Sequence, residues 1–134
     1  MNRGTIVYVE DDSDDAIIMA EIFASIENAP ALCTFNDGKK ALTYLNEKND
    51  VCFVLIDMNM PGMDGKTLVT NIKNVPALKN LPLAFLSTSR SPQDHNLALS
   101  LGMHFFVKPN TIEGLNKLAK EIIHSADHEV RAGS

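Results

Sequence analysis

The stretch TIVYVEDDSDD, residues 5–15, joins a β-branched apolar run to five closely spaced acidic side chains. Residues 5–10 predict a short strand that is buried on both faces. Residues 14–27 carry apolar side chains at helical spacing and predict a helix, with Ser13 as its N-cap and Asp12 as a loop or capping residue. Carboxylates repel one another and resist losing water, so this crowded strand end needs a balancing positive charge.

The same succession of a strand and a helix recurs four more times along the chain. The further strands are predicted at 31–36, 51–58, 81–87 and 104–108. The further helices are predicted at 37–48, through Leu68, Val69 and Ile72, from Ser91 to Gly102, and through Leu115, Leu118, Ala119, Ile122 and Ile123. A polar tail over 125–134 is expected to fray. Five βα units in a row favour an α/β fold in which a parallel sheet carries helices on both faces.

Size and composition exclude several classes of protein. The 134 residues correspond to one domain, and the net charge of −5 argues against nucleic-acid binding, which needs clustered cations. No apolar run approaches the roughly 18 residues of a membrane span, and no signal peptide is evident. Cys33 and Cys52 form no CxxC pair and are interpreted as small buried hydrophobic residues. We therefore expect a cytoplasmic protein without a membrane partner.

Polar side chains collect where the predicted strands end, which is where ligands bind in parallel sheets of this kind. Asp57 follows the apolar run VCFVLI, so desolvation and the nearby charges of Glu10 and Asp11 should raise its pKa. One lysine cannot neutralise three carboxylates, whereas Mg²⁺ prefers oxygen ligands and can bridge to a phosphate. The candidate site at these strand ends consists of Glu10, Asp11, Asp57, Ser87, Thr88 and Lys108.

Several of these residues also have plainer explanations. Asp14 and Asp15 fall in the first turn of a predicted helix, where negative charge is favourable to the helix dipole. Taken alone, Ser87 is consistent with a small polar residue at a strand end, and Lys108 with a solvated surface lysine. Phe105 is consistent with an aromatic residue that fills the core.

Four separated segments resemble the receiver domain of response regulators, the CheY-like phosphoacceptor of two-component signalling. The segments are VEDD (9–12), LIDMNMPGMDG (55–65), FLSTS (85–89) and FFVKPN (105–110). The resemblance covers residues 5 to about 125 and implies a three-layer, flavodoxin/CheY-like sandwich with five parallel strands in the order 2-1-3-4-5. It implies a receiver domain over 1–125, a polar tail over 126–134 and no output domain.

The resemblance also implies roles for individual residues. Asp57 would be the phosphorylated residue, and the chain would be no enzyme beyond catalysing its own phosphorylation and dephosphorylation. The ion would be Mg²⁺, with Mn²⁺ as a substitute; its ligands would be Asp11, Asp57 and the backbone carbonyl of Asn59, with Glu10 acting through water. Ser87 would hydrogen-bond the phosphoryl group, Lys108 would pair with its charge, Thr88 would lie near the attacking water, and Phe105 would be the conformational aromatic.

The same resemblance suggests partners. A histidine kinase, with the phytochrome-associated type as one candidate, or a phosphotransfer protein would supply the phosphoryl group. A downstream protein would read the face formed by the fourth helix, fifth strand and fifth helix. The chain would be a monomer or a dimer promoted by phosphorylation.

Three other functions compete with this interpretation. A flavodoxin-like cofactor binder would hold a phosphate after the first strand, where the acidic segment EDDSDD would repel it. An aspartate-nucleophile phosphatase needs an acid two residues after the nucleophile, where this chain has Asn59. A degenerate receiver that binds partners without being phosphorylated stays open, although all five expected side chains are present.

Overall fold

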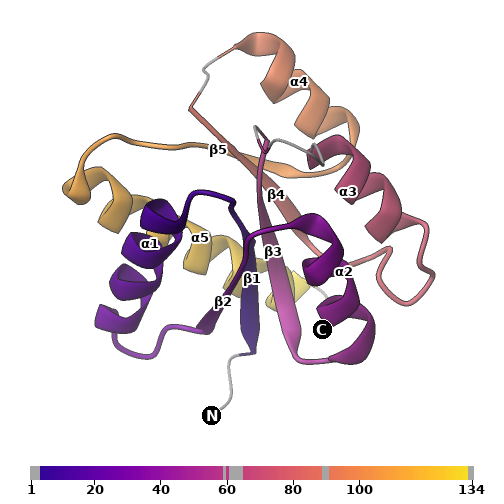
Figure 1. Ribbon diagram of the computed structural model, residues 1–134, viewed down its shortest axis with the longest axis horizontal. Helices are drawn as coiled ribbons and strands as arrows, with labels where there is room; N and C mark the ends of the chain where they lie inside the picture. Colours follow the sequence, from indigo (N-terminus) through magenta and orange to yellow (C-terminus); the bar gives the residue numbers. More distant parts are fainter. Residues whose placement is uncertain (1–3, 59, 61–64, 89–90, 133–134) are drawn as a thin grey trace.

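The computed structural model describes residues 4–58, 60, 65–88 and 91–132, which form one parallel sheet with helices on both faces (Figure 1). The strands are β1 (Thr5–Val9), β2 (Ala31–Phe35), β3 (Val51–Asp57), β4 (Leu83–Ser87) and β5 (His104–Val107). The helices are α1 (Ser13–Ser25), α2 (Gly38–Glu47), α3 (Gly65–Lys73), α4 (Pro92–Ser100) and α5 (Ile112–Ala132). The strand order β2-β1-β3-β4-β5 and the α/β class confirm the predicted fold.

The core consists of two layers of side chains, one on each face of the sheet. Helices α1 and α5 cover one face, and α2, α3 and α4 cover the other (Figure 1). Side chains alternate between the two layers along each strand. In β3, for example, Phe53 and Leu55 join the layer under α1 and α5, whereas Val54 and Ile56 join the opposite layer. The central strands are buried on both faces, as the run of apolar residues predicts.

Capping side chains determine where several helices begin. The carboxylate of Asp12 accepts hydrogen bonds from the backbone N–H groups of Asp14 and Asp15, so Asp12 is the N-cap of α1. The prediction of Ser13 as N-cap is wrong, because Ser13 is already the first helical residue. Helix α4 begins as predicted, with Ser91 as its N-cap.

The C-terminal segment corrects a second prediction. Helix α5 continues to Ala132, so residues 125–132 are helical rather than frayed. The reason is that Ala126 lies one helical turn beyond Ile122 and continues its apolar stripe. Ala126 is 1% exposed and packs in the layer shared with α1. No helix in the described part of the chain is both long and apolar enough to cross a membrane.

Candidate metal centre

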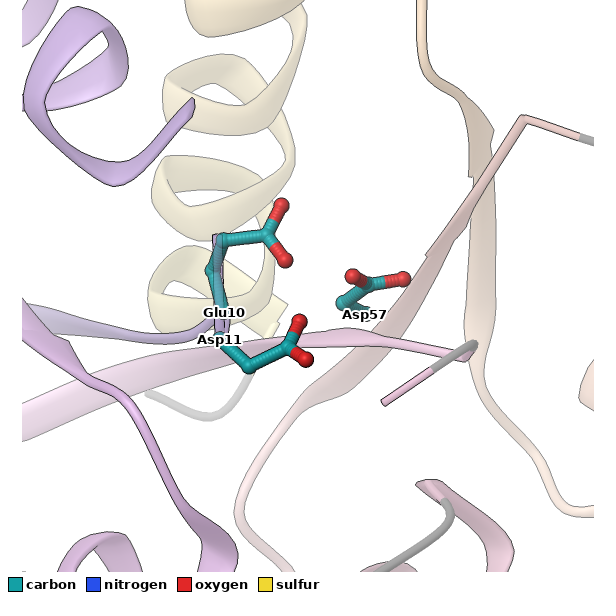
Figure 2. A group of neighbouring side chains, drawn as sticks. All are labelled: Glu10, Asp11 and Asp57. Atoms are coloured by element: carbon teal, nitrogen blue, oxygen red, sulfur yellow. The ribbon is translucent and has the colours of Figure 1, made fainter. Parts of the chain in front are cut away.

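Three carboxylates meet at the carboxyl end of the sheet. β1 and β3 pair in parallel with Val9 opposite Ile56, so the next residues along the two strands, Glu10 and Asp57, are neighbours. Carboxylate oxygens of Glu10, Asp11 and Asp57 all lie within 4.8 Å of one another. Figure 2 shows the three side chains pointing into a common space. The predicted acidic cluster is therefore present in the structure.

The three acids differ in their exposure to solvent. Glu10 is 2% exposed, Asp57 is partly buried, and Asp11 is exposed. Oε2 of Glu10 is buried and has no hydrogen-bond partner among the described residues. Burial raises the pKa of Glu10, and the neighbouring Asp57 carboxylate raises it further, whereas Lys108 acts in the opposite direction. An ionised Glu10 is thus only partly compensated by its protein neighbours.

This donor set fits a divalent cation. The three carboxylates lie close together, and one of them has a buried oxygen without a partner among the described residues. They provide the hard oxygen ligands that Mg²⁺ and Mn²⁺ prefer. Asp11 is exposed, so the cluster is in contact with solvent on that side. Asn59, whose backbone carbonyl is the remaining expected ligand, lies outside the described residues.

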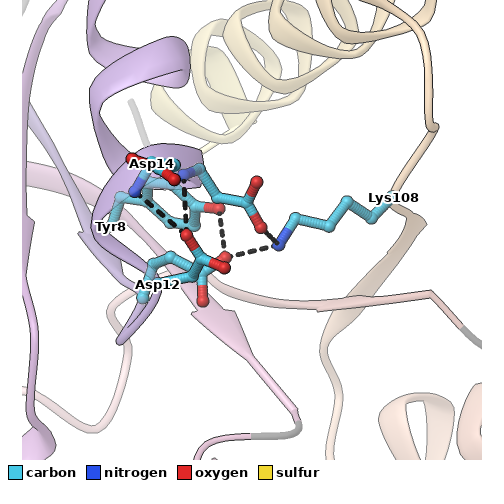
Figure 3. A network of polar contacts seen from close by, with 6 residues as sticks. Tyr8, Asp12, Asp14 and Lys108 are labelled. Atoms are coloured by element: carbon cyan, nitrogen blue, oxygen red, sulfur yellow. Dashed lines mark hydrogen bonds and ion pairs between the residues drawn. The ribbon is translucent and has the colours of Figure 1, made fainter.

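Lys108 brings a positive charge to this edge of the sheet. Its Nζ contacts Oε1 of Glu10 and lies 2.7 Å from Oδ2 of Asp15 (Figure 3). Burial alone would lower the pKa of Lys108, but its hydrogen bonds to Asp15 and Glu10 outweigh that effect and raise the pKa. Lys108 is therefore no solvated surface lysine: its side chain is only 13% exposed. Asp15 lies in the first turn of α1 as predicted, and it also forms an ion pair with Lys108 that the sequence did not predict.

Alternation along the strands explains why these charges meet. Glu10 follows Tyr8 by two residues, Asp57 follows Leu55, and Lys108 follows Phe106, and all three preceding residues belong to the layer beneath α1 and α5. The charged side chains therefore leave the sheet on the side of α1, where Asp15 lies.

Tyr8 is a further member of the site that sequence reasoning missed. It is fully buried, and its hydroxyl donates to Oε1 of Glu10 at 3.1 Å. Burial, together with the charge of Glu10, raises the pKa of Tyr8, so the phenol stays protonated and acts as a donor. The signal was present in the sequence, because residues two apart on a strand share a face.

The remaining predicted residues that the structure describes lie on β4, directly after it, or on β5. Ser87 is 1% exposed, and its backbone carbonyl accepts a hydrogen bond from the backbone N–H of Lys108 at 2.8 Å. Thr88 is exposed at the end of the same strand. Phe105 is partly buried, and its ring stacks on His95 of α4 with centroids 5.3 Å apart. Phe105 thus combines core packing with a contact to a surface helix.

Comparisons of the sequence and of the structure with known proteins point to the same family. The sequence pattern described as the response regulator receiver domain matches residues 6–120. A probable methanogenesis regulatory protein, FilR2, from Methanothrix harundinacea is 29% identical, over 87% of this chain and 79% of that protein. The structure resembles that of the phosphorylated cyanobacterial phytochrome response regulator RcpA, with 28% identity, a TM-score of 0.77 and coverage of 89% and 90% of the two chains. It also resembles the Mn²⁺-bound form of response regulator Rcp1, with 25% identity, a TM-score of 0.76 and coverage of 89% and 91%.

Proposed function

Since the chain belongs to the response regulator receiver domain family, we propose that it accepts a phosphoryl group on Asp57 with the help of a divalent cation. The observation that carries this proposal is the carboxylate cluster, in which Glu10 keeps a buried oxygen without a hydrogen-bond partner. The resemblance to a phosphorylated and to an Mn²⁺-bound response regulator supports both parts of the proposal.

In the proposed reaction a carboxylate oxygen of Asp57 attacks the phosphorus of a donor. A new P–O bond forms, the bond from phosphorus to the donor atom breaks, and the bonding electrons leave with the donor. The product is an acyl phosphate, which water cleaves to return the carboxylate and inorganic phosphate. The chain would thus catalyse only its own phosphorylation and dephosphorylation. A bound Mg²⁺, held by Asp11 and Asp57 with Glu10 beside it, would neutralise the phosphoryl oxygens.

Lys108 and Ser87 would then respond to the new group. Phosphorylation adds about −1.5 to −2 units of charge and three acceptor oxygens. Lys108 already lies beside Glu10, so a small movement of its side chain away from Asp15 would let it pair with the phosphoryl group. Ser87 follows Leu86, whose neighbour on β3 is Asp57, and its hydroxyl would turn toward the same group.

The response would be read at α4, β5 and α5. Phe105 would link this face to the site: it lies on β5, packs in the core and stacks on His95 of α4. A shift of the β4 end would change the space available to Phe105 and so move α4. We propose a histidine kinase or phosphotransfer protein as the donor, and the resemblance to a phytochrome response regulator favours a phytochrome-type kinase.

Intact-mass measurement tests the phosphoacceptor. The wild type, incubated with acetyl phosphate and Mg²⁺, should gain the mass of one phosphoryl group, and a chelator should suppress the gain. Asp57→Asn should gain nothing, whereas Asp14→Asn, which removes an exposed carboxylate from the first turn of α1, should behave as the wild type. A wild type that binds the metal but gains no mass would favour the degenerate receiver instead.

A further inference from the structure

Tyr8 places a hydroxyl group inside a hydrocarbon layer. The side chain is 0% exposed and packs with residues of α1 and α5, and a phenylalanine would fill the same space. A buried hydroxyl is costly unless it is hydrogen-bonded. The partner that the strand provides is Glu10, whose Oε1 accepts the hydrogen bond at 3.1 Å. The polar end of Tyr8 is therefore directed at the carboxylate cluster.

The two oxygens of Glu10 have opposite surroundings. Oε1 receives a hydrogen bond from Tyr8 and another from Lys108, whereas Oε2 is buried without a partner in the described part of the chain. Two donors that converge on one oxygen hold the carboxylate group at a fixed rotation about its last bond. The carboxylate held in this way points into the space that it shares with Asp11 and Asp57 (Figure 2).

We propose that Tyr8 is a positioning residue for the metal centre: its hydroxyl orients Glu10 so that Oε2 faces the ion or a water bound to it. Partners that orient a ligand in this way commonly change metal affinity by about 10- to 100-fold. Lys108 cannot replace Tyr8 in this task, because in the proposed reaction it turns toward the phosphoryl group, whereas Tyr8 stays in the core. The inference rests on the proposed function, since it assumes that the cluster binds a divalent ion.

Metal titration separates the orienting role from simple packing. We expect Tyr8→Phe to bind Mn²⁺ about tenfold more weakly than the wild type, measured by the loss of the free-ion signal in electron paramagnetic resonance. Tyr44→Phe is the matched control, because Tyr44 lies on α2, over the opposite face of the sheet. In a Glu10→Gln background, Tyr8→Phe should cause no further loss, since it acts through the Glu10 carboxylate.

A spectroscopic measurement gives a second readout. The chain has two tyrosines and no tryptophan, so Tyr44→Phe leaves Tyr8 as the sole source of tyrosine absorption. Adding Mg²⁺ to this variant should change its near-ultraviolet difference spectrum, and adding Mg²⁺ to Tyr8→Phe should not. This arm keeps the proposal testable even if Tyr8→Phe folds poorly.

The outcomes separate a failure of metal binding from a failure of the role proposed for Tyr8. A wild type that takes up no Mn²⁺ or Mg²⁺ at millimolar concentration would overturn the proposed function itself. A wild type and a folded Tyr8→Phe variant that bind Mn²⁺ equally well would leave the function standing but overturn the role of Tyr8. If Tyr44→Phe binds the metal and its near-ultraviolet spectrum does not change, the role of Tyr8 is also overturned.

Discussion

Lys108 reaches from the end of β5 to the first turn of α1, where its Nζ lies 2.7 Å from Oδ2 of Asp15. The same ammonium group contacts Glu10. Lys108 is the residue expected to pair with a phosphoryl group on Asp57, so before phosphorylation it is shared between two carboxylates. Asp15 belongs to α1, whereas Glu10 belongs to the carboxylate cluster. Both contacts would have to loosen for Lys108 to pair with a phosphoryl group. One holds Lys108 to α1, and the other holds it to the carboxylate cluster.

Removing the contact to Asp15 should release Lys108. We expect Asp15→Asn to accept the phosphoryl group from acetyl phosphate faster than the wild type, because Lys108 then has one anchor fewer. The Asp15 side chain is 40% exposed, so the change should cost at most about 1 kcal/mol of unfolding free energy. Time-resolved intact mass and urea denaturation measure the two effects. Asp14→Asn is the control, since it removes the same charge from the same turn; an equal acceleration there would point to net charge instead of Lys108.

The stability of the metal-free protein should depend on Glu10 and pH. The folded-state pKa of Glu10 is raised above its ordinary 4.5, so the native state holds this proton more tightly than the unfolded state does. Its contribution to stability is therefore present at low pH and is lost as pH rises from about 4.5 through the folded pKa.

Thermal melts of the wild type and Glu10→Gln measure this dependence. The wild type without metal should lose stability relative to Glu10→Gln as the pH is raised through that window. Saturating Mg²⁺ should reverse the difference, because the ion compensates the ionised carboxylate. If the melting temperatures of the two proteins differed by the same amount at every pH, the raised pKa of Glu10 would be contradicted.

The stack of Phe105 on His95 should loosen on phosphorylation. Nuclear Overhauser contacts between the two rings, whose centroids are 5.3 Å apart, should weaken when acetyl phosphate and Mg²⁺ are added. The pair formed by Phe35 and Tyr44, with centroids 5.1 Å apart, lies away from α4 and is the internal control. Asp57→Asn should keep both sets of contacts unchanged. Persistence of the Phe105 contacts in fully phosphorylated protein would argue against this aromatic as the moving part.

The end of α5 gives a prediction about stability alone. Ala126→Glu should lower the unfolding free energy by about 2–4 kcal/mol, because it forces a charged side chain into the layer between α1 and α5. His124→Glu places the same carboxylate on the exposed side of the helix and should change stability by no more than about 0.5 kcal/mol. Urea denaturation compares the two. Similar midpoints would mean that the helix past Ser125 contributes little.

The fold was predictable because each element carries its own periodic signal. The alternation of apolar strands with amphipathic helices led to the parallel sheet, and the strand ends led to Glu10, Asp11 and Asp57. The contacts of Lys108 with Asp15 and of Tyr8 with Glu10 were harder to foresee. The first joins residues far apart in the chain, so it depends on how helices pack on the sheet. The second was a local signal, hidden because a tyrosine in a buried strand is ordinarily explained by packing.

The errors at element ends have physical causes as well. Ser and Asp both cap helices well, and the sequence alone does not say which of Ser13 and Asp12 has the non-helical backbone of a cap. The polar composition after Ser125 concealed Ala126, whose small side chain is a weak apolar signal. Its burial becomes visible only when α5 is placed against α1.

The carboxylate cluster and the stack of Phe105 on His95 lie on opposite faces of the sheet. Glu10, Asp57 and Lys108 emerge on the side of α1, while Phe105 and its stack on His95 belong to the opposite side. Under the proposed function, a change at Asp57 would have to cross from one layer to the other. The end of β4 offers such a crossing, because Leu86 faces one layer and the next residue, Ser87, faces the other. Under the proposed function, substitutions on the α4 side should therefore alter partner binding without displacing Glu10 or Asp57.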